Sequence, residues 1–182
     1  QAQFDLQPYQ THGILISMSL SQKILAMSLV LLAGCEPDAR IPGLFGGADG
    51  VAAMNAPDKV EAWRTISQDK LELDQREGKK VPQTKGKLAD YLIVEGPAEV
   101  DAPSGTEIAT ILQSSIYDWD QPPVDCIPNP GFAVQFTKGT NSVLVFFCFE
   151  CSVMDTYFNG GRAGYADFSH GNLLTLLQRV SP

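Results

Sequence analysis

The amino-acid sequence predicts a small α+β domain with a mainly antiparallel sheet, a central β-hairpin and two or more short helices, one of them C-terminal. The hairpin is the clearest element. Two apolar runs, residues 132–136 and 143–149, are joined by a polar segment that contains Gly139 and Asn141. Gly and Asn tolerate the positive φ that tight turns between antiparallel strands require. A capping motif and a leucine-rich C-terminal segment predict the helices.

The second hairpin strand is expected to lie inside the sheet. Residues 143–147 include no polar side chain. Such a run suits a strand that is covered on both faces, whereas at an exposed edge it would promote aggregation. We therefore place this strand at the centre of the predicted sheet.

Two segments carry helical patterns. Ser104 and Glu107 are three residues apart and match a capping box, which predicts a helix from Ser104 to about Ser115. Ser169 is expected to cap the last helix, where Arg179 in the final turn complements the helix dipole. The apolar face of that helix consists of Leu173, Leu176, Leu177 and Val180.

Shorter patterns complete the domain. Alternating apolar and polar residues predict a strand within 58–69, and residues 90–100 predict a strand that breaks at Gly96 and Pro97. Residues 152–157 are expected to be extended, and 159–164 to form a turn. Two connections are predicted, a polar, charged loop at 75–87 and a proline-rich crossing at 118–130.

The N-terminal residues have the pattern of a targeting signal. The chain does not begin with Met, and its first Met is Met18. Because the signal pattern after Met18 is complete, residues 1–17 are interpreted as a non-native upstream extension, with a cut fragment as the alternative. Residues 18–34 follow the order of a signal peptide. Lys23 supplies the positive charge, residues 24–32 form the apolar core, and small residues come next.

The sequence Leu32, Ala33, Gly34, Cys35 resembles the lipobox of bacterial lipoproteins. The resemblance implies that the peptide before Cys35 is removed and that its thiol is lipidated. Two or three acyl chains anchor a protein stably, so it also implies attachment to a bacterial membrane, facing the periplasm or the exterior. Two alternatives remain, a transmembrane helix over 13–34, which a central Lys makes costly, and a plain secretory signal.

Two regions follow the signal. Residues 35–55 are rich in Gly, Ala, Pro and Asp and are expected to form a flexible tether. Residues 56–182 are expected to form a single α+β domain. Each interpretation of the N-terminus places this domain outside the cytoplasm, in the cell envelope.

Three cysteines lie close to the predicted hairpin. Cys126 precedes its first strand, and Cys148 and Cys151 form a C-x-x-C at the end of the second. Folding the hairpin would bring these ends together. One interpretation is a disulfide from Cys126 to Cys148 or to Cys151, which would close a loop of about 22–25 residues and stabilise the fold by about 3 kcal/mol.

Two alternatives use the same thiols. Cys148 and Cys151 could act as a redox exchange pair, although thioredoxin-like sites place the first cysteine at a helix N-terminus and here a strand precedes it. The weaker alternative is a metal site built from the three thiolates, with His170 or Asp155 as fourth ligand.

The C-terminal half carries a second resemblance. A Cys-x-Pro at Cys126, an apolar hairpin, a Cys-Phe-x-Cys at Cys148 and a Leu-rich helix resemble uncharacterised bacterial envelope proteins over about residues 90–182. The resemblance implies no activity. It implies a shared structural role for Cys126, Cys148 and Cys151.

Composition and missing motifs restrict the function. The chain has 13 basic and 21 acidic residues, a net charge of -8, which argues against a nucleic-acid partner. It contains no G-x-S-x-G, G-x-x-x-x-G-K-[ST] or G-x-G-x-x-G, so no catalytic residue and no cofactor is predicted. We expect a lipid-anchored binding or structural accessory module rather than an enzyme, with the membrane and a candidate envelope protein as partners. The alternative is thiol–disulfide redox or metal handling by the three cysteines.

Overall fold

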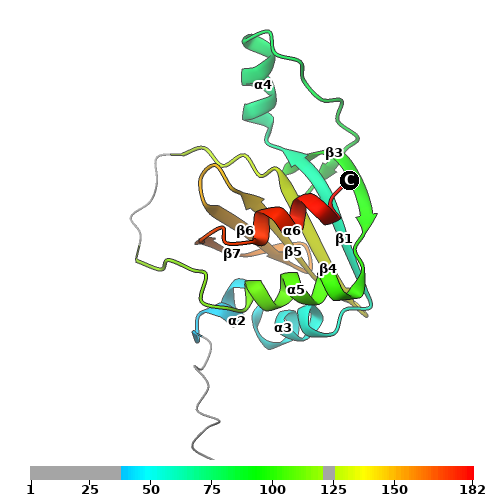
Figure 1. Cartoon of the computed structure of the whole chain (residues 1–182), viewed down its shortest axis with the longest axis vertical. Helices are drawn as coiled ribbons and strands as arrows, with labels where there is room; N and C mark the ends of the chain where they lie inside the picture. Colours follow the sequence, from blue (N-terminus) through cyan, green and yellow to red (C-terminus); the bar gives the residue numbers. More distant parts are fainter. Residues whose placement is uncertain (1–37, 121–125) are drawn as a thin grey trace, which may run out of the picture. The chain divides into compact units, whose positions relative to one another are not determined.

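The structure, a computed structural model of the 182-residue chain, describes residues 38–120 and 126–182. In these residues, five helices accompany a seven-stranded antiparallel sheet that curls into a half-barrel (Figure 1). The strand order is β2-β3-β1-β4-β5-β6-β7. The predicted α+β class, with a mainly antiparallel sheet and a C-terminal helix, is confirmed. The predicted upstream extension, signal peptide and lipobox with Cys35 lie outside the described residues.

The described elements have the following bounds. The helices are α2 (Ile41–Leu44), α3 (Gly47–Asn55), α4 (Gln68–Arg76), α5 (Ala102–Leu112) and α6 (Leu173–Val180). The strands are β1 (Lys59–Ile66), β2 (Lys87–Leu88), β3 (Tyr91–Glu99), β4 (Phe132–Lys138), β5 (Asn141–Cys148), β6 (Val153–Phe158) and β7 (Gly161–Asp167).

The predicted hairpin is formed by β4 and β5. Its register places Val134 opposite Val145 and Phe132 opposite Phe147. Strand β5 lies between β4 and β6, and its residues 143–147 are all buried. The expectation of an interior strand covered on both faces is therefore confirmed.

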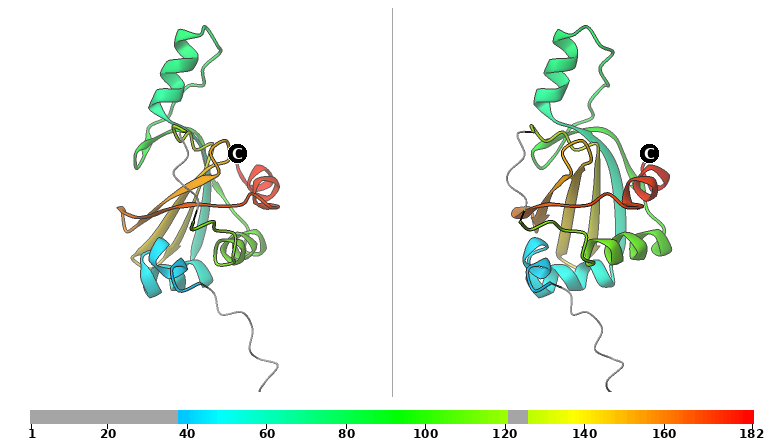
Figure 2. Two further views of the ribbon diagram at one scale, coloured as in Figure 1. Left: turned by 90° about the vertical axis from the view of Figure 1, so that its left-hand side faces the viewer. Right: turned by 60° about the vertical axis from the view of Figure 1, so that its left-hand side comes forward.

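One face of the sheet is covered by helices. Alternate residues of a strand point to opposite faces, and Ala62, Val134 and Met154 belong to the helix-covered core. Helices α3, α5 and α6 lie against this face (Figure 2). Leu173, Leu176 and Leu177 of α6 are buried there, as the sequence predicts.

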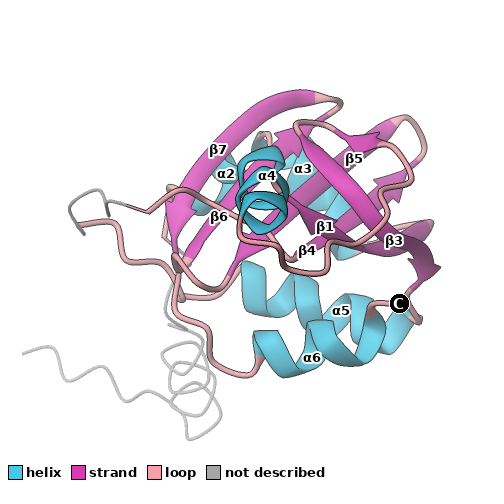
Figure 3. Ribbon diagram, turned by 90° about the horizontal axis from the view of Figure 1, so that it is seen from above, coloured by secondary structure: helices cyan, strands magenta, loops and turns pink. Residues whose placement is uncertain are grey.

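The opposite face is shielded by the curl of the sheet itself (Figure 3). Strands β1 and β4 separate β3 from β5, yet the rings of Tyr91 and Phe146 are only 4.6 Å apart between centroids. The hydroxyl of Tyr157 donates a hydrogen bond to Oδ2 of Asp90 at 2.6 Å. These contacts bury Trp63 and the aromatic residues around it in a second, smaller core.

The predicted tether is wrong over residues 38–55. Helices α2 and α3 bury Ile41, Phe45 and Met54 in the main core, and Pro37–Pro182 forms one compact unit. The small residues permit close approach rather than flexibility. A Cβ on Gly50 would lie 1.6 Å from the carbonyl oxygen of Phe45, so only Gly fits there.

Several element boundaries also differ from expectation. The residues of helix α4 were expected to form the end of a strand and the start of a loop. A helix forms instead, and the side chain of Ser67 caps it by accepting a hydrogen bond from the backbone N–H of Lys70. Helix α5 begins after Asp101 rather than at Ser104, because Asp101 accepts from the backbone N–H of Ser104. Helix α6 begins after Asn172, since the N–H of Ser169 bonds to Ile116 instead.

The strands differ from expectation at two places, Gly96–Pro97 and the predicted turn at 159–164. Strand β3 continues through Gly96 and Pro97 without a break, with Gly96 at φ +103° packed close to the carbonyl oxygen of Ala62. The expected turn at 159–164 is shorter, because Gly161–Asp167 forms β7. The predicted extended segment at 152–157 is found as β6.

The core position of α3 predicts a large effect of truncating Met54. Met54→Ala should lower the free energy of unfolding by about 2–5 kcal/mol, because it leaves a cavity in the main core. Chemical denaturation of the full chain measures this. The control Ala52→Ser, on the exposed side of the same helix, should change it by no more than about 0.5 kcal/mol. Equal effects of the two changes would contradict the packing of α3.

The aromatic face predicts a loss of stability at high pH. Burial, and then the charge of Asp155, raise the pKa of Tyr91 to about 12. The unfolded chain releases this proton near pH 10, so the contribution of Tyr91 is present below pH 10 and is lost as the pH rises toward 12. Tyr91→Phe should make the loss shallower in denaturation curves at pH 9 to 12. An unchanged slope would contradict the buried position of the phenol.

Candidate functional site

The cysteine cluster of the sequence is assembled at one end of the sheet. Cys126 and Cys151 form a disulfide with Cα atoms 5.9 Å apart, and Cys148 is a buried free thiol. The expectation of a disulfide is confirmed, and of the two pairings that the sequence left open the structure contains the one to Cys151. Cys148 ends β5, and Cys151 lies in the four-residue loop 149–152 between β5 and β6.

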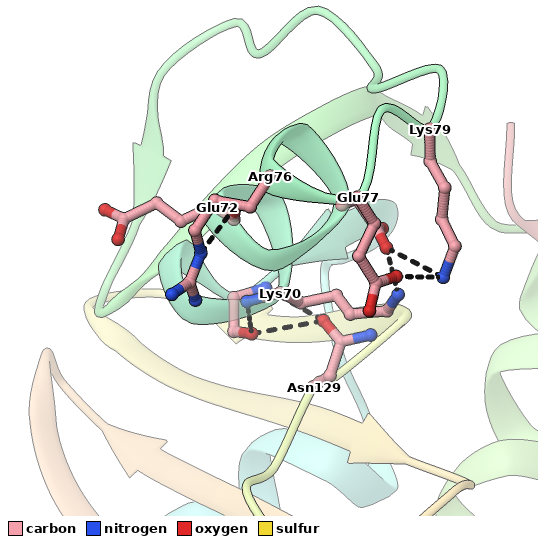
Figure 4. A network of polar contacts seen from close by, with 8 residues as sticks. Lys70, Glu72, Arg76, Glu77, Lys79 and Asn129 are labelled. Carbon is pink, nitrogen blue, oxygen red and sulfur yellow. Dashed lines mark hydrogen bonds and ion pairs between the residues drawn. The ribbon is translucent and has the colours of Figure 1, made fainter.

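Asn129 connects this cluster to the neighbouring elements. Its backbone N–H donates to Sγ of Cys148 at 3.3 Å. Its side-chain Oδ1 accepts from the N–H of Ser67 at 3.0 Å and lies 3.3 Å from the Ser67 hydroxyl. Ser67 is the cap of α4, so a single Asn links the free thiol to the start of that helix. Figure 4 shows Asn129 beside the first turn of α4.

The redox pair and the metal site that the sequence also suggested are not present in the described residues. Cys151 is bonded to Cys126, so the predicted exchange pair Cys148–Cys151 is not the disulfide that is present. The alternative metal site needs three thiolates, and one thiol remains. The described residues contain no cluster of three or more His, Cys, Asp or Glu side chains that could hold a metal ion.

The suggested fourth metal ligands have other contacts. His170 Nε2 lies 3.0 Å from the Oγ of Ser152, and its ring packs edge-on against Phe149. Asp155 accepts a hydrogen bond from Nε of Arg162 at 2.7 Å on the aromatic face of the sheet. Both residues therefore serve the packing of the domain.

Three cavities surround the disulfide loop. The first, about 550 Å³, is lined by Cys126, Cys151 and Asp167 among others. The second, about 460 Å³, lies between the end of β1 and Phe149. The third, about 650 Å³, separates α4 from the exposed Ile127. We call this region the cysteine end: the loop 149–152, the segment 126–131 and the first turn of α4.

Glu150, the residue between the two cysteines of the C-x-x-C, lines all three cavities. Its side chain is exposed, so it stands on the rim that the cavities share. In the first cavity, burial raises the pKa of Asp167, and the nearby Asp118 raises it further. The cysteine end therefore offers hollows lined by both charged and apolar residues rather than an assembled set of reactive groups.

Helix α4 forms one wall of this end and has its own polar network. Lys70 Nζ lies 2.6 Å from Oδ1 of Asp74, and Lys79 contacts both Asp74, at 3.5 Å, and Glu77, at 2.6 Å (Figure 4). None of the residues of α4 is buried. The helix is therefore held through its first turn and projects from the sheet (Figure 1).

The cysteines are marked by their spacing in the sequence, but the residues around them are not. Asn129 lies in the segment predicted as a proline-rich crossing, and Arg64 is more than 60 residues before Cys126. Neither residue belongs to a local motif. The capping signal at Ser67 was readable, because Ser precedes an acidic and then a helix-forming stretch.

Comparison with protein families, with curated proteins and with solved structures finds no match to this chain. In the described residues, no helix has both the length and the apolar character needed to cross a membrane.

The disulfide predicts a specific pattern of thiol reactivity. Alkylation of the folded protein without reductant, followed by peptide mass mapping, should show Cys126 linked to Cys151 and Cys148 unmodified until the chain unfolds. Cys126→Ser combined with Cys151→Ser should lower the free energy of unfolding by about 3 kcal/mol, because the disulfide closes a loop of 25 residues. A map with Cys148 in the bridge would contradict the pairing.

Proposed function

We propose that the chain is a lipid-anchored protein of the bacterial cell envelope and that its folded unit is a binding or structural accessory module. Two features support this proposal. The sequence at Leu32 to Cys35 resembles a lipobox, and disulfides such as Cys126–Cys151 form and persist in oxidising compartments.

The short sequence separation between Cys35 and helix α2 supports a particular orientation. Helix α2 begins at Ile41, six residues after Cys35, and six residues span at most about 20 Å. A lipid on Cys35 would therefore hold the α2 and α3 end close to the membrane surface.

The cysteine end lies at the opposite end of the strands. Helix α3 contacts the start of β5, where Gly50 is close to Val143, and β5 ends at Cys148. Eight strand residues span roughly 25 Å at about 3.3 Å per residue. The proposal thus places the second and third cavities away from the membrane, where a partner from the envelope could reach them.

The observation that carries the binding role is the clustering of the cavities at the disulfide. Cavities of several hundred cubic ångströms are the usual size of ligand sites. Here they share the rim residue Glu150, and the bridge from Cys126 to Cys151 fixes the segment between them. A disulfide that braces the walls of a site lowers the entropic cost of binding.

A second candidate function is thiol–disulfide exchange, and one observation favours it. The Sγ of Cys148 contacts Asn129, three residues from Cys126, and the Sγ of Cys151 lies 3.6 Å from the carbonyl oxygen of Ile127. In an exchange, the Cys148 thiolate would attack the disulfide, form a bond to Cys126 and release Cys151 as a thiolate. One inert thiol and a stable bridge under mild reductant would exclude this function, whereas rapid exchange of the bridge would favour it over the accessory role.

The lipid anchor predicts that Cys35→Ser releases the protein from membranes. The substitution removes the sulfur that would carry the lipid, so the variant should move from the membrane to the soluble fraction on cell fractionation. The matched control Cys148→Ala changes another cysteine and should stay with the membrane. If Cys35→Ser also stays there, the anchor is a helix and not a lipid.

A further inference from the structure

The second cavity of the cysteine end combines an apolar wall with a cation. Its volume is about 460 Å³, most of its lining is apolar, and Phe132, Phe149 and Leu174 are among its apolar residues. It lies on the helix-covered side of the sheet, beside the start of α6. Two basic residues, Arg64 and Lys70, line the same cavity.

Arg64 has no polar partner among the described residues. Its guanidinium lies over the ring of Phe132, 4.2 Å from the centroid, and no hydrogen bond or ion pair accompanies this contact. Its neighbour in register on β3 is Glu95, but it is the adjacent Val94 that lines the cavity. A half-buried guanidinium without an acceptor has unused hydrogen-bond donors.

The second cation is already neutralised. Lys70 Nζ is 2.6 Å from the carboxylate of Asp74. Glu150 adds a negative charge at the rim. The cavity therefore has one unpaired cation, Arg64, and suits a monoanion, because a second negative charge on the ligand would have no cation to pair with.

The geometry points to a binding site for an aliphatic carboxylate in this cavity, with the carboxylate on Arg64 and the apolar tail between Phe132, Phe149 and Leu174. Arginine pairs with carboxylates through two parallel hydrogen bonds, which the planar guanidinium over Phe132 would present. This inference deepens the proposed binding role and rests on it. A free fatty acid and the C-terminus of an apolar peptide share this chemistry.

The test is photo-crosslinking of the purified full chain with a decanoate that carries a diazirine in its tail. Labelled peptides are mapped by mass spectrometry. We expect labelling at the peptides that contain Phe132, Phe149 or Leu174. Decanoate should compete, while decanol and decyltrimethylammonium, which have the same tail and no negative charge, should not. Competition by acetyl-Leu-Leu with a free carboxylate would identify a peptide C-terminus as the source, and its absence a fatty acid.

Matched variants distinguish the effect of the Arg64 charge on labelling from the effect of the space in the cavity. Arg64→Gln should reduce labelling at least fivefold, whereas Arg76→Gln, an exposed Arg on α4, should not change it. Leu174→Trp should also reduce labelling, because it fills the space of the tail while Arg64 is kept. Glu150→Gln should increase labelling. A thermal unfolding curve of each variant shows that its fold is kept.

Unchanged labelling in Arg64→Gln, or equal competition by decanol and decanoate, would overturn the inference and leave an apolar cavity without charge selection. These outcomes are independent of the anchor. The crosslink is mapped on the chain itself, whereas the lipid proposal fails only if Cys35→Ser stays with the membrane.

Discussion

The fold depends on one constraint, the burial of β5 on both of its faces. The run from Val143 to Phe147 has no polar side chain, so the sheet must be shielded on two sides. Helices α3, α5 and α6 shield one side, and the curl that brings Tyr91 onto Phe146 shields the other. A flat sheet with helices on a single face would leave Phe146 and Trp63 exposed to water.

The same constraint places the candidate site. The apolar strand β5 has to stay covered up to its last residue, Cys148. There the segment 126–131 packs against it, and Asn129 donates a hydrogen bond to the Cys148 sulfur. The disulfide from Cys126 to Cys151 and the hydrogen bonds of Asn129 hold that segment in place. The three cavities lie around this irregular cover.

The parts of the fold that the sequence predicts are those with a strong local signal. The apolar run of β5, the turn around Gly139 and the leucine face of α6 each depend on neighbouring residues, and all three are found. The cysteine cluster was expected from the same hairpin geometry. Its pairing was open, because Cys148 and Cys151 are only three residues apart and the choice depends on which sulfur faces the returning segment.

The parts that the sequence does not predict depend on distant contacts. Residues 41–55 have the composition of a linker, but their Gly and Ala residues allow α3 to pack closely on β5. Arg64 is an ordinary strand residue in the sequence, and it becomes a candidate ligand group only because the fold places it in the second cavity with its guanidinium over Phe132. No local pattern records either fact.

The central claim is that the disulfide holds the segments 126–131 and 149–152 together, whereas the folding of the buried strands β4 and β5 does not require it. Hydrogen exchange of the folded protein, measured with and without reductant, tests this most directly. If the claim holds, reduction abolishes protection in residues 126–131 and 149–152, whereas β4 and β5 stay the most protected strands and lose only the roughly 3 kcal/mol that the bridge gives to the whole fold. Loss of protection throughout β4 and β5, or no change at the cysteine end, would contradict it.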